Sequence, residues 1–199
     1  WETAIERANS HSVAYNRFIR LFSAGSGPRY LHNLAQSFIE TGLFRTLTED
    51  GKGKGHPYGA FYGRGYHQLT WTGNYRDYGD FEKFPKNPSH YKDQRITATS
   101  KHPIDSDGVL LTWAPRYDPH IIESDKDLSG RASGFYWVTK KFRKTTNINR
   151  VCDIGVSPIT IGFASWLVNG GGNGYIHRQQ FAKYQAEILL DGTPRFGIA

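Results

Sequence analysis

The chain has little cysteine, no methionine and no long apolar run. Cys152 is the only cysteine among 199 residues, so no disulfide can form within the chain. A stable fold must therefore come from core packing, and a lone cysteine is most often a small buried hydrophobic residue. Since no apolar stretch approaches the roughly 20 residues that cross a bilayer, we predict no membrane span.

The first residues, WETAIERANSHSV, are polar and lack the apolar core of a signal peptide. The chain also starts with tryptophan instead of methionine. We expect a trimmed form, a processed form or one domain of a longer polypeptide. The single cysteine argues against a disulfide-rich secreted protein and favours a bacterial or phage origin.

Basic residues outnumber acidic ones, 25 to 18, which gives a net charge of +7. Such a surface favours an anionic partner: nucleic acid, teichoic acid, anionic lipid or peptidoglycan. The one dense basic cluster, residues 140–144, is interpreted as a solvated helix face. Because no nucleic-acid-binding motif accompanies it, we predict no nucleic-acid partner.

No metal site or cofactor is predicted. The eight histidines are scattered and no His-Glu-x-x-His pattern occurs. The glycine-rich runs GKGKG and NGGGNG lack the preceding strand and the Lys-Ser/Thr pair of a phosphate-binding loop.

Apolar periodicity predicts five helices. They cover residues 3–23, 29–41, 127–144, 157–168 and 175–190. Ser157-Pro158 is a typical helix start, and the helix behind it is apolar almost all round, so we expect it to be central. The last helix is expected to face the core with Ile176, Phe181, Tyr184, Ile188 and Leu189.

The remaining segments predict a small β element and a surface insertion. Residues 58–79 combine aromatics and glycines, which favours short strands or a hairpin followed by a short helix. Residues 80–107 are polar, contain three prolines and show no period, so they are interpreted as a surface insertion. The pattern predicts one mainly helical domain, residues 1–199.

Two carboxylates nine residues apart, Glu40 and Glu49, are the candidate catalytic pair. Hydrolysis of a glycosidic bond needs one carboxylic acid to protonate the leaving oxygen and one carboxylate to activate water or attack the sugar. Glu40 ends an amphipathic helix, where partial burial and the helix dipole favour its neutral form. Glu49 lies in a glycine-rich, solvated loop, which suits the base.

The segment after this pair is suited to binding a sugar. It combines amides, a hydroxyl group and aromatic rings within 14 residues, and the candidates are Tyr62, Tyr66, Gln68, Thr70, Trp71, Asn74 and Tyr75.

Four stretches resemble glycoside hydrolase family 19. FYGRGYHQLTWTGNY resembles the family signature, and AQSFIETGLFRTLTED resembles the segment that carries the catalytic acid. SGRASGFYW and VNGGGNGYIHR resemble two later elements. The four occur in the family's order and cover most of the chain outside residues 76–125. The short gap between the glutamates is similar to that of bacterial and phage members.

The resemblance implies a lysozyme-like α+β fold with a small β element beside the active-site cleft, and a role for each matching residue. Glu40 is the general acid and Glu49 the base that activates water, with inversion at the anomeric carbon. Thr70 helps to position that water. Arg178 lies near Glu49 and keeps it ionised. Other positions that contact the glycan are Gln68, Asn74, Tyr75 and Asn169.

The sequence departs from the family pattern at three places. Ile39 replaces the usual histidine before the acid, and Leu43 replaces the second glycine after it. Tyr66 stands where proline or another small or aliphatic residue is common, and His67 follows it. We interpret His67 and Arg64 as structural. These changes alter the hydrogen bonding behind Glu40 and the shape of one subsite.

The sequence therefore predicts a hydrolase of β-1,4 bonds in peptidoglycan, resembling lysozymes and phage endolysins. A chitinase and a non-catalytic module that binds cell-wall glycan are the alternatives. We expect a monomer that acts in the periplasm or on the cell wall, either released by phage or delivered as a toxin domain. An immunity or delivery protein is a possible partner.

Overall fold

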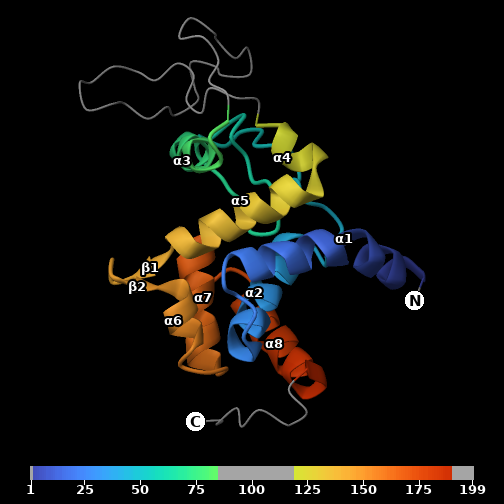
Figure 1. Cartoon of the computed structure of the whole chain (residues 1–199), viewed down its shortest axis with the longest axis vertical. Helices are drawn as coiled ribbons and strands as arrows, with labels where there is room; N and C mark the ends of the chain where they lie inside the picture. Colours follow the sequence, from blue (N-terminus) through green and yellow to red (C-terminus); the bar gives the residue numbers. More distant parts are fainter. Residues whose placement is uncertain (1, 85–118, 190–199) are drawn as a thin grey trace, which may run out of the picture.

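The computed structural model describes residues 2–84 and 119–189, and within them the chain is mainly helical with one small antiparallel sheet (Figure 1). The elements in chain order are α1 (Glu2–Leu21), α2 (Gly27–Glu40), α3 (Thr72–Glu82), α4 (Ile121–Ser124), α5 (Lys126–Thr139), β1 (Lys141–Phe142), β2 (Thr146–Asn147), α6 (Ile148–Cys152), α7 (Pro158–Asn169) and α8 (Tyr175–Leu189). The predicted α+β class is confirmed.

Helices α1 and α5 cross closely because α5 presents small residues to α1. A Cβ atom at Gly130 would lie 3.2 Å from the carbonyl oxygen of Ala14, and one at Gly134 would overlap the ring of Phe22. The run SGRASG therefore serves as a contact surface on which a larger residue would push the two helices apart. Figure 1 shows the pair dividing the molecule, with α3 and α4 on one side and α2, α6, α7 and α8 on the other.

Helix α7 begins where the sequence predicts. Ser157 is the N-cap, and it exchanges hydrogen bonds with Thr160: Thr160 N donates to Ser157 Oγ and Ser157 N donates to Thr160 Oγ1. The expectation that α7 is central holds for only part of its surface. One face packs inward, while Ile159, Phe163 and Trp166 are exposed on the other.

Helix α8 begins at the predicted residue, Tyr175, but does not have the predicted buried face. Four of the five expected core residues are exposed: Ile176, Tyr184, Ile188 and Leu189. Its buried residues are Arg178, Ala182, Gln185 and Ala186. The small alanines let α8 pack closely on α2 and α7, and Arg178 is buried because it finds partners on α2.

The basic cluster at residues 140–144 belongs to a hairpin, not to a helix face. Helix α5 ends at Thr139, because Lys140 takes an extended conformation and Asn147 Nδ2 donates to the carbonyl oxygen of Val138. The expected strands near residue 58 are reduced to two isolated bridges, Thr48 with Arg64 and Arg64 with Leu69.

Most of the predicted insertion at 80–107 lies outside the described residues. No helix in the described ranges is long and apolar enough to cross a membrane. Cys152 is buried, in agreement with its interpretation as a core residue.

Candidate active site

Glu40 is the last residue of α2, and the turn that follows it is closely held. The buried face of α2 includes Leu31, Ala35 and Ser37. Thr41 caps the helix: its hydroxyl donates to the carbonyl oxygen of Ser37 at 2.7 Å and accepts from Phe44 N at 2.9 Å. Glu40 itself is half-buried at this end of the helix.

Glu49 is fixed more firmly than a solvated loop residue. Its backbone N–H donates to the carbonyl oxygen of Gly63 at 2.9 Å. Its carboxylate accepts from Tyr58 Oη at 2.7 Å and from Gly63 N at 2.7 Å. Two hydrogen bonds to one carboxylate set both its position and its orientation. Glu49 is thus partly exposed, as a loop residue, but its carboxylate is held by two partners.

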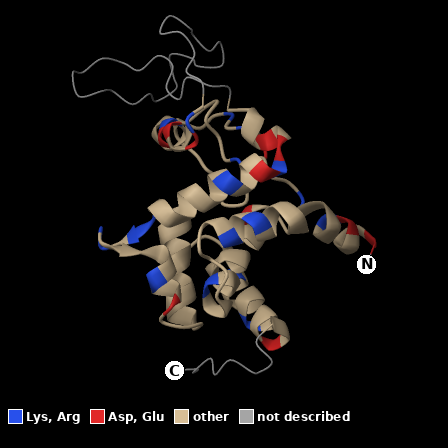
Figure 2. Cartoon of the chain, in the orientation of Figure 1, with Lys and Arg blue, Asp and Glu red and all other residues tan. Residues whose placement is uncertain are grey.

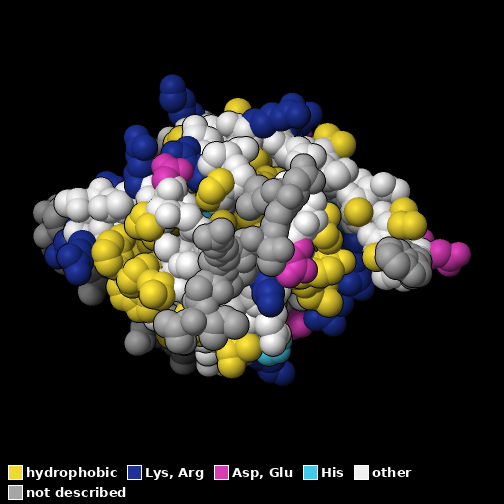
Figure 3. Space-filling view, turned by 90° about the horizontal axis from the view of Figure 1, so that it is seen from below, with side chains coloured by type: hydrophobic (Ala, Val, Ile, Leu, Met, Phe, Trp, Pro, Cys, Tyr) yellow, Lys and Arg dark blue, Asp and Glu magenta, His cyan; other side chains and the backbone are white. Residues whose placement is uncertain are grey.

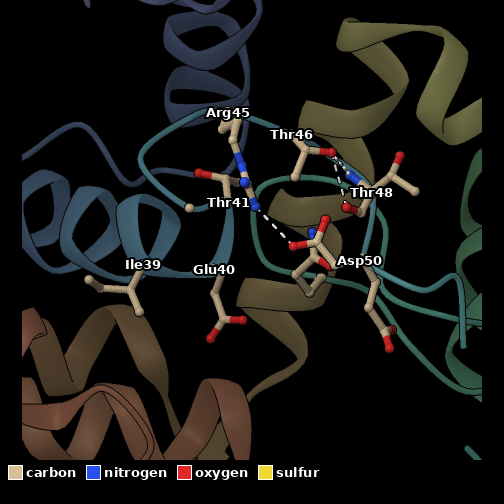
Figure 4. A pocket seen from close by; sticks show the side chains of 10 residues that line it. Ile39, Glu40, Thr41, Arg45, Thr46, Thr48 and Asp50 are labelled. Carbon is tan, nitrogen blue, oxygen red and sulfur yellow. Dashed lines mark hydrogen bonds and ion pairs between the residues drawn. The ribbon is translucent and has the colours of Figure 1, made fainter.

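Both glutamates line the same cleft, which has a volume of about 390 Å³. Figure 4 shows Glu40 extending from the end of α2, while Arg45 and Asp50 pair across another part of the wall. Gln68 also lines the cleft. The residues that complete its lining are Ile39, Thr41, Gly42, Thr46 and Thr48.

Arg178 pairs with Glu40, not with Glu49 as the sequence predicted. Arg178 Nη2 donates to Glu40 Oε1 at 2.7 Å, and Nη1 donates to Gln36 Oε1 at 2.7 Å. The arginine is only 2% exposed. Arg178 meets Glu40 because α8 packs against α2, which brings the arginine to the end of the helix that carries Glu40.

Asn169 lies on the same side, as the last residue of α7 before the loop that leads to α8. Its Nδ2 donates to the carbonyl oxygen of Asn173, which also accepts from Arg178 Nε at 3.2 Å. Its Oδ1 accepts from Gly171 N at 2.8 Å. Asn169 therefore helps to hold the loop that positions Arg178, and through it Glu40.

The polar residues after Gln68 form a short hydrogen-bonded chain. Thr70 Oγ1 donates to the carbonyl oxygen of Gln68 at 2.7 Å, and Asn74 Nδ2 donates to the carbonyl oxygen of Thr70 at 2.6 Å. Gln68 lies over Gly63, where any Cβ atom would overlap the glutamine side chain. The glycine at position 63 is thus required for the close approach of Gln68.

Tyr62 and Tyr75 belong to the core and do not offer their rings to a glycan. Tyr62 is 3% exposed and Tyr75 is fully buried. Both surround the buried Arg64, whose guanidinium lies 3.6 Å from the centre of the Tyr62 ring and donates to Tyr75 Oη at 2.8 Å. Their assignment to the sugar groove is corrected, whereas Arg64 is structural as expected.

Trp71 remains available for contact, since it is 44% exposed. Its φ of +76° is rare for a residue with a side chain, and such outliers gather at functional sites. Its indole meets the Tyr58 ring edge to face at 5.3 Å. This contact links Trp71 to the phenol that binds Glu49.

His67 is a core residue, as expected. It is 1% exposed, and its ring lies 3.0 Å from Ser37 Oγ and 3.2 Å from the carbonyl oxygen of Ser133. Burial lowers the pKa of His67 to about 4, so the ring is neutral at pH 7.

Sequence reasoning missed Tyr58 and Glu123. Tyr58 carried a usable signal, a phenol in the glycine-rich loop nine residues after Glu49. Glu123 carried none. It accepts from Thr48 Oγ1 at 3.1 Å and from Tyr62 Oη at 3.2 Å, and it pairs with Arg64. Burial opposes its ionisation, but the hydrogen bond from His120 and the Arg64 charge together lower the pKa of Glu123.

In the described parts of the chain, no three His, Cys, Asp or Glu side chains gather closely enough to hold a metal ion. Three carboxylates, those of Glu40, Glu49 and Asp50, line the cleft, and carboxyl groups can donate or accept protons.

No protein-family model matches the sequence, and no curated protein matches it. Solved structures do match. Chitinase C from Streptomyces griseus HUT6037 is 19% identical with a TM-score of 0.61, covering 94% of this chain and 85% of the chitinase. A mutant of chitinase C is also 19% identical, with a TM-score of 0.58 and coverage of 95% and 85%. A bacterial family 19 chitinase, again 19% identical, has a TM-score of 0.50 and coverage of 90% and 85%.

Similarity at this level of identity bears on the fold alone. The described part of the chain has the mainly helical α+β fold of these chitinase structures.

Proposed function

We propose that the chain is an inverting glycoside hydrolase of family 19 type that cuts β-1,4 bonds in an amino-sugar polymer. The observation that carries the proposal is the presence of Glu40 and Glu49 in one cleft, each held by a different set of partners. Two carboxylates in unequal environments are what acid–base cleavage of a glycosidic bond requires.

In the proposed reaction, Glu40 donates a proton to the leaving glycosidic oxygen while Glu49 accepts a proton from water. The bond from the anomeric carbon to the leaving oxygen breaks, and a bond from that carbon to the water oxygen forms on the opposite face. Tyr58 and Gly63 hold Glu49 toward the water. Thr70 helps to position the water, and Gln68, Trp71 and Asn74 bind the sugar, as does Asn169.

The ion pair with Arg178 sets a condition on this mechanism. Arg178 Nη2 lies 2.7 Å from Glu40 Oε1, and proton donation to the glycosidic oxygen needs the acid form of the carboxyl group. The proposal therefore requires that the acid form of Glu40 be populated in the substrate complex.

Peptidoglycan is the proposed substrate. The net charge of +7 suits an anionic cell-wall polymer, and the absence of disulfides within the chain suits a bacterial or phage lysin. The place of action is then the periplasm or the cell wall, reached by phage release or by delivery as a toxin domain with an immunity partner. Chitin is the alternative substrate, in keeping with the activity named for the structural neighbours.

The test compares the wild type with Glu40→Gln and Glu49→Gln on purified peptidoglycan and on chitin oligomers. Each substitution is expected to lower the rate by about 10²–10⁴-fold, the usual contribution of a positioned acid or base. Glu187→Gln, on the exposed side of α8, is the matched control and should retain full activity. Mass spectrometry of the products identifies the substrate and the reducing-end sugar, and early products should carry the α-anomer. Equal release by all four proteins contradicts the proposal.

The Arg178–Glu40 ion pair also supports a second candidate, a module that binds cell-wall glycan without cleaving it. Ile39 and Leu43, which depart from the family pattern beside Glu40, point the same way. This candidate predicts sedimentation of the wild type with cell walls and no soluble sugar product.

A further inference from the structure

A stripe of large apolar side chains on α7 faces solvent. Ile159, Phe163 and Trp166 are 67%, 39% and 56% exposed. Spacings of four and three residues place them on one face of the helix. Figure 3 shows apolar side chains gathered on the side of the molecule where Figure 1 draws α6 and the hairpin. Exposed apolar patches of this kind mark interaction surfaces.

The β1–β2 hairpin extends the stripe and adds positive charge. The rings of Phe142 and Phe163 lie 5.1 Å apart, and the Arg143 guanidinium lies 5.2 Å from the centre of the Phe142 ring. Figure 2 shows basic residues on the hairpin and on α6. The charged residues between positions 140 and 173 are Lys140, Lys141, Arg143, Lys144, Arg150 and Asp153.

The only acidic side chain of that stretch is already paired. Asp153 binds Arg29 Nη2 at 2.7 Å and lies 3.5 Å from Arg150 Nη1. Among the described residues between 140 and 173, no further acidic side chain neutralises the remaining basic residues.

The tip of the hairpin keeps its cations at an unfavourable backbone position. Arg143 and Lys144 have φ values of +49° and +66° in a turn closed by Thr145 N donating to the carbonyl oxygen of Phe142 at 3.2 Å. Two successive positive φ values favour Asn-Gly in such a turn. Long basic side chains at these positions are therefore not explained by the needs of the turn.

We propose that Phe142, Arg143, Lys144, Ile159, Phe163 and Trp166, here called the hairpin–α7 surface, dock onto an anionic lipid bilayer. The apolar side chains enter the headgroup region and the cations meet the lipid phosphates. Charge decides between this occupant and a second copy of the chain, because a dimer would bring two positive surfaces together. The inference does not depend on the proposed glycosidase activity.

The first test is sedimentation with vesicles of phosphatidylcholine containing about 30% phosphatidylglycerol, compared with pure phosphatidylcholine. The double variant Arg143→Asn with Lys144→Gly removes both cations and suits the turn, so its Tm should not fall. Its binding to anionic vesicles is expected to be at least about tenfold weaker. Lys52→Gln with Lys54→Gln removes the same charge from an exposed loop and should change binding less than about twofold.

The second test asks whether the apolar stripe enters the bilayer. Vesicles with brominated acyl chains should quench tryptophan fluorescence in the wild type and in Trp71→Phe. The quenching should disappear in Trp166→Phe. Phe163→Ser, at a second exposed position of the stripe, should weaken vesicle binding without lowering Tm.

Four outcomes overturn the proposal. They are equal vesicle binding by the hairpin and loop double variants, quenching that persists in Trp166→Phe, and binding to soluble polyphosphate with no quenching by vesicles. The fourth is a dimer in sedimentation velocity that Trp166→Ser dissociates, since this would assign the surface to a second copy.

Discussion

The two catalytic candidates, Glu40 and Glu49, bind partners at very different separations in the sequence. Glu40 binds Arg178, which lies 138 positions further along the chain. Glu49 binds Tyr58 and Gly63, only nine and 14 positions away. The Glu40 wall of the cleft, α2 with its partners on α8, therefore depends on helix packing. The Glu49 wall, residues 48–63, depends on how one loop closes on itself.

The largest effect is expected from breaking the Glu40 wall at Arg178. Arg178→Leu leaves the Glu40 carboxylate and the Gln36 amide oxygen without their donor beside a buried site. Removing one partner of a buried ion pair costs about 3–5 kcal/mol. We expect a loss of stability in this range, measured by urea unfolding, together with loss of activity.

The matched control lies on the rim of the same cleft. Arg45 also forms an ion pair, with Asp50, but the two side chains are 59% and 83% exposed. Arg45→Leu should therefore change the free energy of unfolding by less than about 1 kcal/mol. Similar losses for both variants would show that burial does not distinguish the two pairs.

Low pH should destabilise the fold at the Glu40 wall by protonating His67, which contacts Ser37 of α2. The pKa of His67 is about 4 in the folded protein and about 6.5 in the unfolded chain, so the unfolded state binds more protons between these values. Stability should fall as pH drops from about 6.5 to about 4, by about 3 kcal/mol in total. Urea unfolding across this range checks it.

The control for this prediction is His67→Asn, which removes the titrating group. Its stability should be lower at pH 7 but should change less between pH 6.5 and pH 4. Parallel curves for the wild type and the variant would assign the acid sensitivity to other groups.

Local signals in the sequence predicted most of the helices. Ser157-Pro158 marks the start of α7 because its capping partners, Ser157 and Thr160, are three residues apart. The buried face of α8 was not predictable in this way. Its most apolar residues face solvent, and Arg178 is buried because α2 supplies Gln36 and Glu40 as partners.

In the candidate site, too, residues within local motifs were predictable, whereas contacts that depend on helix packing were not. Motif resemblance identified Glu40, Glu49 and Gln68, all of which line the cleft. It placed Arg178 beside the wrong glutamate, because pairing over 138 positions depends on how α8 packs. Tyr75 resembled a groove residue by sequence, yet its hydroxyl group is occupied in the core by Arg64.

Two glycines, one on the Glu49 wall and one beside the Glu40 wall, allow the rigidity of the two walls to be compared by substitution with alanine. A Cβ atom at Gly53, on the Glu49 wall, would overlap the carbonyl oxygen of Gly59. One at Gly174, beside the Glu40 wall, would lie 3.0 Å from Ile39 Cγ2, a side chain that can shift. Both glycines have positive φ, which costs alanine about 1–2 kcal/mol.

Gly174→Ala should therefore cost about 1–2 kcal/mol, and Gly53→Ala more, because backbone must move. Thermal unfolding and activity on the same preparations measure both effects. A larger loss of stability for Gly174→Ala would show that the backbone of the Glu49 wall adjusts more easily than the contact between Gly174 and Ile39 of α2.

A modest effect is expected at Tyr58, where one of two local hydrogen bonds to Glu49 is removed. Tyr58→Phe deletes the 2.7 Å bond to Oε1 but leaves the bond from Gly63 N to Oε2. A hydrogen bond to a charged group contributes about 1.5 kcal/mol, so stability should fall by about that amount. Burial, and then the contact with Glu49, raise the pKa of Tyr58, so the phenol stays a donor through neutral pH. The activity of Tyr58→Phe should accordingly fall by a similar factor at pH 6 and pH 8, while Tyr184→Phe, at an exposed phenol on α8, should match the wild type. If Tyr58→Phe instead abolishes activity as completely as Glu49→Gln, the Gly63 bond alone does not orient the base, and the Glu49 wall depends on a single side chain.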